Sequence, residues 1–281
     1  MSARHPLEEP TLRRFRHLMA RGRPDAARDC LLDALAREPN LPAVHVALAR
    51  VRWPGPDYRF WLSWFHTHLT PRLYLEIGVE KGDTLALARP PTRAVGVDPA
   101  PLGDPLQHCN DNARLYRQTS ADFFAAVPAD SGLTPDGFDL AFIDGDHRFE
   151  TVLDDFIAIE RHAARGAVVL LHDTLPLTAA TAARERRTGF YTGDGWKIVP
   201  CLRSLRPDLR IMTVPTAPTG LTVITGLDPR NTVLPDRRPL IRQTYATLPP
   251  EHAVAAPHTM FSLGVNDSDW VAQWLRSARG R

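Results

Sequence analysis

The stretch FDLAFIDGDHRFETVLDDFIAIERHAARGAVVLLHDT, residues 138–174, decides the fold class of this chain. It contains two short apolar runs rich in strand-forming residues, 138–143 and 167–171, and the segment between them has apolar residues at helical spacing. This order predicts two parallel strands joined by a crossover helix. Because parallel strands end at the same edge of a sheet, the polar residues that follow the two runs should meet there.

Five ionisable side chains follow these two strands. They are Asp144, Asp146 and His147 after the first strand, and His172 and Asp173 after the second. Carboxylate oxygens together with imidazole suggest a divalent metal site, a general base, or both. The structural alternative is that Asp144 and Asp146 complete a turn and that His147 caps the helix after it.

The alternation of strands and helices extends along the chain. Further strands are expected near residues 73–77, 94–98, 114–118, 209–214 and 220–225, with helices between most of the strands. The connection between the last two strands, APT, is too short for a parallel crossover, which needs about a dozen residues, so this pair should be antiparallel. We therefore predict an α/β fold with a doubly wound, seven-stranded sheet.

Three parts of the chain differ in pattern. Residues 1–70 look helical, and RGRPDAARDCLLDALAREPNLPAVHVALARV within them resembles one tetratricopeptide unit. These helices are expected to cap the next domain or, alternatively, to bind a partner. Residues 71–230 hold the strand–helix alternation, and 231–281 form a Pro-rich extension that ends in a short helix. The long connection 175–200 is a candidate lid or substrate loop.

Composition limits the class of protein. The chain has 281 residues and a net charge of +2, which is too small to indicate a nucleic-acid partner. Its three cysteines are widely spaced and odd in number, which fits a reducing cytoplasm. The start, MSARHPLEEP, lacks an apolar signal-peptide core, and the central run AVVLL is far too short to span a bilayer. We expect a cytoplasmic protein without a membrane or nucleic-acid partner.

A second motif lies earlier in the chain. LYLEIGVEKGDTL places Glu76, Gly78, Gly82 and Thr84 in the pattern E-x-G-x-x-x-G-x-T, after a strand and at the expected start of a helix. Glycine lets the backbone approach a ligand without obstruction by a Cβ. Asp98 ends the next strand, where its carboxylate can accept hydrogen bonds from both hydroxyls of a ribose. An ordinary tight turn would explain the two glycines taken alone.

With these motifs the chain resembles the class I S-adenosylmethionine-dependent methyltransferases, whose sheet is Rossmann-like with seven strands and an antiparallel last strand. The resemblance implies that S-adenosyl-L-methionine binds with Glu76 and Gly78 near its methionine part and Asp98 on its ribose. Ser120 and Ala121 match the adenine-contacting turn of the family, although Ser120 could equally cap the following helix. The expected cofactor-binding residues are Glu76, Gly78, Gly82, Thr84, Asp98, Ser120, Ala121 and Asp144.

Residues 138–174 resemble more narrowly the metal-dependent O-methyltransferases of antibiotic-sugar tailoring, the macrocin, mycinamicin and novobiocin type. This resemblance implies a metal site formed by Asp144, His172 and Asp173. His172 stands where the family has Asp or Glu, and imidazole suits manganese, iron, nickel or zinc better than Mg²⁺. Either the metal differs, or His172 points elsewhere, or the metal is absent. The general base would be Asp146 or His147. We favour His147, because its ordinary pKa of about 6.5 suits proton transfer near neutrality.

The sequence therefore predicts an O-methyltransferase that acts on a hydroxyl of a small molecule, such as a sugar or a secondary metabolite. A metal would lower the pKa of that hydroxyl, and the base would take its proton. Two alternatives remain open. One is a metal-dependent hydrolase or hydroxylase built on the Asp/His cluster, and the other is a non-catalytic cofactor-binding scaffold recruited through the N-terminal helices. The acceptor and the oligomeric state are also open, a homo-oligomer included.

Overall fold

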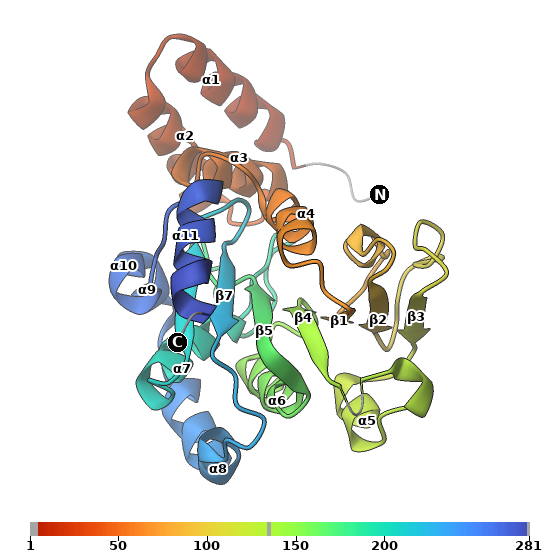
Figure 1. Ribbon diagram of the computed structural model, residues 1–281. Helices are drawn as coiled ribbons and strands as arrows, with labels where there is room; N and C mark the ends of the chain where they lie inside the picture. Colours follow the sequence, from red (N-terminus) through yellow and green to blue (C-terminus); the bar gives the residue numbers. More distant parts are fainter. Residues whose placement is uncertain (1–4, 134–135, 280–281) are drawn as a thin grey trace.

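A seven-stranded sheet forms the centre of the protein, of which this computed structural model describes residues 5–133 and 136–279 (Figure 1). The strand order is β3-β2-β1-β4-β5-β7-β6. Strand β7 runs antiparallel to both of its neighbours, and the other neighbouring pairs are parallel. The predicted fold class is thus confirmed. The strands are β1 (Leu73–Ile77), β2 (Arg93–Val97), β3 (Ala113–Tyr116), β4 (Phe138–Ile143), β5 (Ala163–His172), β6 (Arg210–Val214) and β7 (Leu221–Thr225).

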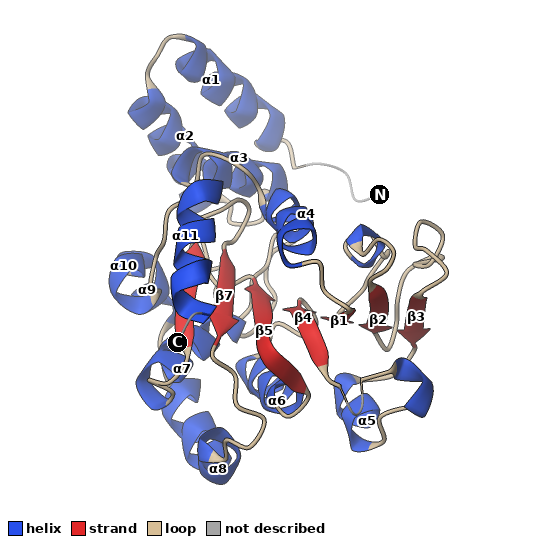
Figure 2. Cartoon of the chain, viewed as in Figure 1, coloured by secondary structure: helices blue, strands red, loops and turns tan. Residues whose placement is uncertain are grey.

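Helices cover both faces of the sheet (Figure 2). Alternate residues of a strand point to opposite faces, so that Leu75 of β1 joins one core and Tyr74 joins the other. Trp61 and Phe65 are fully buried in the second core, as their aromatic clustering would suggest. The first core lies under α5 (Ser120–Ala125), α6 (Phe149–Glu160), α7 (Ile198–Leu205) and α8 (Val233–Ala246), and the second lies under α4 (Tyr58–Leu69) and α11 (Ser268–Arg279).

The N-terminal helices lie together at one end of the molecule (Figure 1). They are α1 (Glu8–Ala20), α2 (Pro24–Arg37) and α3 (Pro42–Arg52). Their own small core includes Leu177 and Ala217, which belong to the loops after β5 and β6. The helical character of this segment agrees with the sequence pattern, while its role as a cap or as a partner-binding unit stays a prediction. No helix in the described ranges is long and apolar enough to cross a bilayer.

The helix expected directly after the glycine turn does not form. The described chain has one 3-10 turn there, Leu85–Leu87. Pro90 and Pro91 follow closely, and proline removes the backbone donor and excludes a helix interior. The few residues between Gly82 and Pro90 are too short a segment to nucleate a stable helix.

The C-terminal extension is more helical than the sequence suggested. Besides α8 and α11 it contains α9 (Pro250–Ala255) and α10 (Pro257–Met260). Proline occupies the first turn of both short helices, where its missing N–H costs nothing. The predicted final helix is α11: Asp267 accepts a hydrogen bond from the Trp270 amide at 2.9 Å, and Val271 and Leu275 are buried.

Candidate active site

A single cleft of about 770 Å³ lies at the carboxyl ends of the central strands. Cavities of roughly 300–1,000 Å³ are typical of small-molecule and cofactor sites. The strand-end residues that the sequence singled out line this one cleft. They include Gly78 and Thr84 after β1, Asp98 after β2, Asp144 after β4 and Asp173 after β5.

The two glycines of the turn are required by close backbone contacts. Gly78 and Gly82 have φ angles of 86° and 84°, in the left-handed region that favours glycine. A Cβ on Gly78 would lie 2.2 Å from the backbone oxygen of Asp144, and one on Gly82 would lie 1.9 Å from that of Pro105. The turn therefore packs directly against the end of β4, and the two sequence motifs are in contact.

Glu76 supports the turn from beneath and is not among the residues that line the cleft. Its side chain is fully buried, and its carboxylate accepts hydrogen bonds from the Tyr74 hydroxyl at 2.6 Å and the Thr84 hydroxyl at 2.7 Å. Burial raises the pKa of Glu76 to about 8, although both hydrogen bonds oppose the shift. The expected contact of Glu76 with a cofactor stays a prediction.

Asp98 ties the glycine turn to the end of β2. One of its oxygens accepts from the amides of Val79 and Glu80, both at 2.9 Å, and the other accepts from the Ala100 amide at 2.8 Å. A carboxylate offers about four acceptor sites, so one remains for a ligand. Asp98 lines the cleft, and its expected contact with a ribose stays a prediction.

The turn after β3 differs in detail from its expectation. Thr119, not Ser120, caps α5: its side chain accepts from the Asp122 amide at 3.1 Å. Ser120 is the first helical residue and lines the cleft together with Thr119. Ala121 is exposed and is not part of the lining. The capping interpretation of Ser120 was therefore wrong by one residue.

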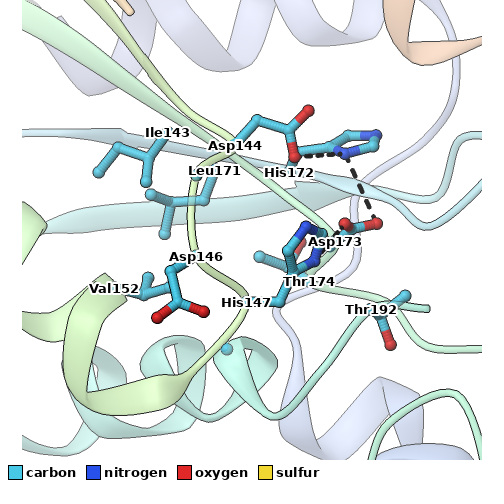
Figure 3. A pocket seen from close by; sticks show the side chains of 12 residues that line it. Ile143, Asp144, Asp146, His147, Val152, Leu171, His172, Asp173, Thr174 and Thr192 are labelled. Atoms are coloured by element: carbon cyan, nitrogen blue, oxygen red, sulfur yellow. Dashed lines mark hydrogen bonds and ion pairs between the residues drawn. The ribbon is translucent and has the colours of Figure 1, made fainter. Parts of the chain in front are cut away.

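Side chains from the ends of β4 and β5 turn toward one another (Figure 3). His147 Nδ1 lies 2.8 Å from Asp173 Oδ2, and His172 Nδ1 lies 3.2 Å from Asp144 Oδ1 and 3.5 Å from Asp173 Oδ1. Asp173 has a φ of 55°, which is unusual for a residue other than glycine and costs roughly 1–3 kcal/mol. Backbone strain of this kind is typical of functional sites.

These groups could hold a metal ion, in a set that differs from the predicted one. Asp144, His147 and Asp173 each offer one ligand atom, and these atoms all lie within 4.8 Å of one another. The sequence analysis predicts His172 as the third metal ligand. Nδ1 of His172 instead faces the two carboxylates at 3.2–3.5 Å, and its Nε2 is buried without a partner among the described residues. Two carboxylates with an imidazole fit a first-row divalent ion such as Mn²⁺.

The carboxylates hold both imidazoles in the charged form. Burial would lower the pKa of His147, but the Asp173 carboxylate outweighs it and raises the pKa to about 9. The pKa of His172 is raised in the same way, against burial, by Asp144 and Asp173. The reason for naming His147 as the base, an unperturbed pKa, therefore does not apply to this arrangement.

Asp146 is directed away from the other four side chains (Figure 3). Its oxygens accept from the Arg148 amide at 3.3 Å and the Thr151 hydroxyl at 2.9 Å. These contacts stabilise the turn before α6, which agrees with the turn that the structural alternative gave to Asp146; the N-cap residue of α6 is Arg148, not His147. The role of Asp146 as a base stays a prediction.

Part of the sheet and its strand ends is similar to a known protein family. Residues 75–174, from β1 to just after β5, match a family described as a methyltransferase domain. Over these residues the chain is therefore similar to methyltransferase domains. Comparison with curated proteins gave no match.

Solved structures similar to this chain include cofactor-bound Rv0187 from MTB, at 18% identity and a TM-score of 0.51, with coverage of 66% of this chain and 89% of that one. The O-methyltransferase TomG from Streptomyces achromogenes, in complex with SAM, is 15% identical, with a TM-score of 0.48 and coverage of 60% and 78%. An O-methyltransferase from Bacillus cereus, in complex with SAH, is 13% identical, with a TM-score of 0.47 and coverage of 70% and 89%. The likeness to Rv0187 supports the fold of the domain.

Two residues that contact the Asp/His cluster were not found from the sequence. The Tyr58 ring, at the start of α4, lies 4.2 Å from the His172 ring and lines the cleft. Thr219, in the hairpin between β6 and β7, donates its hydroxyl hydrogen bond to Asp173. The sheet order could have indicated Thr219, because the antiparallel β7 lies beside β5.

Proposed function

We propose that this protein is an O-methyltransferase that transfers the methyl group of S-adenosylmethionine to a hydroxyl of a small molecule. The observation that carries the proposal is the continuity of the cleft, which reaches from the Gly78 turn to the carboxylates of Asp144 and Asp173. Methyl transfer is a one-step displacement, so the donor and the acceptor must lie in one cavity with their reacting atoms aligned. A volume of about 770 Å³ has room for both.

The donor would occupy the part of the cleft at the ends of β1 and β2. The remaining acceptor site of Asp98 is available for a ribose hydroxyl, and the amides of Val79 and Glu80 already hold that carboxylate in place. Because the carboxylate is fixed before the ligand arrives, little conformational entropy is lost on binding. Gly78 keeps the floor of this part free of side chains.

The acceptor hydroxyl would lie near the cluster at the ends of β4 and β5. Asp144 and Asp173 belong both to the predicted ligand set and to the three residues whose ligand atoms lie within 4.8 Å of one another, and His147 or His172 would be the third donor. A divalent ion bound there would lower the pKa of the acceptor hydroxyl. Asp173 fixes the ring of His147 through Nδ1. The same carboxylates keep His147 charged, so it could act as a base only where His172 completes the ligand set and the bound ion offsets their charge, which would free Nε2 to take the hydroxyl proton. We therefore retain His147 as the proposed base and place Asp146 in a supporting role.

The proposed transferase differs from the hydrolase alternative in using the glycine turn, and from the scaffold alternative in transferring a methyl group. A metal-dependent hydrolase or hydroxylase would use the Asp/His cluster and leave the turn and Asp98 without a ligand. A scaffold would bind the cofactor and transfer nothing. The family match over both motifs favours a transferase over the hydrolase.

Two measurements separate these functions. Calorimetric titration with S-adenosylhomocysteine should give micromolar binding, and no binding at millimolar ligand would contradict a methyltransferase. Incubation with methyl-labelled S-adenosylmethionine and a panel of sugars, phenols and hydroxy acids, followed by mass spectrometry, should give a methyl ether. Binding without transfer to any hydroxyl would favour the scaffold.

A further inference from the structure

A turn in the long connection after β5 contacts the main chain of His147. The turn is Gly193-Asp194-Gly195, and its Gly195 amide donates a hydrogen bond to the His147 carbonyl at 2.8 Å. A Cβ on Gly193 would lie 2.3 Å from the same carbonyl oxygen, so only glycine allows this approach. Gly193 also has a φ of 62°, in the left-handed region. The turn therefore touches the backbone of the residue whose side chain faces Asp173.

Asp194, in the middle of the turn, extends this contact to the start of α6. Its Oδ1 atom accepts a hydrogen bond from the Phe149 amide at 2.9 Å. Arg148, the N-cap residue of α6, makes no side-chain capping bond, so Asp194 supplies the acceptor that a cap residue normally offers. Asp194 is buried, and its Oδ2 atom pairs with Lys197 at 3.0 Å. The chain that follows His147 is thus held by a distant segment of the sequence.

The segment that carries the turn is itself fixed. Residues 192–199 are all buried. The amides of Thr192 and Gly193 donate to the Thr181 carbonyl at 3.0 and 3.1 Å, and the Trp196 side chain is fully buried. A segment that opens locally has few buried apolar contacts and many exposed backbone hydrogen bonds, and residues 192–199 have the opposite character. The turn can therefore act as a rigid support.

The ring and the main chain of His147 are held by different parts of the protein. Asp173 contacts the ring nitrogen Nδ1 at 2.8 Å, whereas the turn contacts the carbonyl. A shift of the main chain would carry the ring with it and change its distance to the Asp/His cluster. Reacting groups must be held to within about 0.5 Å, and a misplacement of about 1 Å can cost about 10²-fold in rate. Contacts at the backbone therefore bear on the chemistry of the ring.

We propose that the turn Gly193–Gly195 positions His147 for methyl transfer. The inference rests on the proposed function, in which His147 is the base or a ligand of the metal ion. It goes beyond that function because none of the three residues of the turn lines the cleft of about 770 Å³. They are positioning residues, which act on the reaction only through His147.

The test compares two glycines that have the same kind of backbone strain. Gly193→Ala places a Cβ against the His147 carbonyl and should displace that residue. Gly137→Ala is the matched control: Gly137 has a φ of 71°, and its Cβ would lie 2.5 Å from the His162 carbonyl oxygen. Gly137 precedes β4, at the edge of the sheet opposite the cleft. Both variants should lose similar stability, with melting temperatures within about 3 °C of each other.

Turnover and cofactor affinity are then measured on the full-length proteins, with an acceptor found in the hydroxyl panel. Gly193→Ala should lower kcat by about 10- to 100-fold. Its Kd for S-adenosylhomocysteine and its KM for S-adenosylmethionine should stay within about threefold of the wild-type values. Gly137→Ala should keep the kcat of the wild type. A contact that serves stability alone would affect both variants alike, and that result would overturn the inference.

The NMR signal of the His147 ring gives a readout that does not depend on turnover. The Cε1–H signal, assigned by its loss in His147→Ala, should shift in Gly193→Ala and stay in place in Gly137→Ala. An unchanged signal in Gly193→Ala would contradict the proposed displacement. A shifted signal together with wild-type kcat would mean that the position of His147 does not limit the reaction, and would overturn the inference as well.

A milder pair of variants is used if Gly193→Ala fails to fold. A Cβ on Gly195 would lie 3.3 Å from the His147 carbonyl oxygen, and one on Gly189, in the same connection, would lie 3.0 Å from Pro42 instead. Gly195→Ala should lower kcat by about 3- to 10-fold, and Gly189→Ala should leave it unchanged; equal kcat values in this pair would overturn the inference. A wild type that binds no S-adenosylhomocysteine, or transfers methyl to no hydroxyl, would instead show that the proposed function itself fails.

Discussion

Replacement of Glu76 by Gln should stabilise the folded protein progressively as the pH rises above about 5. Glu76 is fully buried beneath the glycine turn, and burial raises its pKa from 4.5 to about 8. In the unfolded chain the carboxyl ionises at its ordinary pKa. Between these two values the folded state must keep a proton that the unfolded state releases, so folding loses free energy with each pH unit.

The size of the effect follows from the shift. One pKa unit corresponds to about 1.4 kcal/mol, so the wild type should lose roughly 3 kcal/mol relative to the Gln variant by pH 7 and roughly 4–5 kcal/mol above pH 8. Below pH 4.5 both forms are neutral and the difference should be constant. Gln can keep the contacts with Tyr74 and Thr84, because an amide both donates and accepts.

Urea unfolding at several pH values between 4.5 and 9 measures this difference directly. Glu185→Gln is the control, because Glu185 is largely exposed and its replacement should give a difference that does not vary with pH. A flat difference for Glu76→Gln would refute the reasoning, since Glu76 would then titrate normally in the folded state. The same variant tests the predicted contact of Glu76 with the cofactor: a change in affinity for S-adenosylhomocysteine of less than about threefold would remove that contact, because Glu76 does not line the cleft.

Three further predictions concern the cleft. Asp98→Ala should weaken S-adenosylhomocysteine binding by about 1–3 kcal/mol, as measured by calorimetry. Asp139→Ala is the control, because Asp139 also accepts from two backbone amides, those of Arg72 and Leu73 at the amino-terminal end of β1. This control should lower stability without changing the affinity for S-adenosylhomocysteine. His147→Ala should reduce turnover by about 10²- to 10⁴-fold at unchanged cofactor affinity, and a larger loss with Asp146→Ala would make Asp146 the base. Removal of divalent ions by a chelator should abolish methyl transfer and added Mn²⁺ should restore it, whereas full activity in the chelator would mean that Asp144 and its neighbours hold the acceptor directly.

The fold was predictable because its signals are local. The apolar runs that became β1 and β4 have the expected bounds, and the short connection between β6 and β7 required an antiparallel pair. The helix after Gly82 was predicted wrongly. The family pattern has a helix there, but the prolines at 90 and 91 end the segment after one 3-10 turn. The prolines of α9 and α10 misled in the opposite direction, since they begin helices.

The contents of the site were predictable, but its contacts were not. Residue types at strand ends indicated that Asp98, Asp144 and Asp173 would share one edge, and they line one cleft. The contacts between side chains depend on the direction in which each side chain points. A shift of one residue along the chain, or a rotation about one side-chain bond, changes that direction. Asp146 turned to Thr151, and His147 took the place beside Asp173 that we had given to His172.

By itself the sequence determined the order of the strands and helices, the edge of the sheet that binds, and the kinds of chemistry available there, because periodicity and turn residues act over a few neighbouring positions. Only the tertiary structure decided that Glu76 is buried beneath the turn and that Thr219 reaches Asp173. Burial and hydrogen-bond partners depend on segments far apart in the chain, and those distances are set only when the layers pack together.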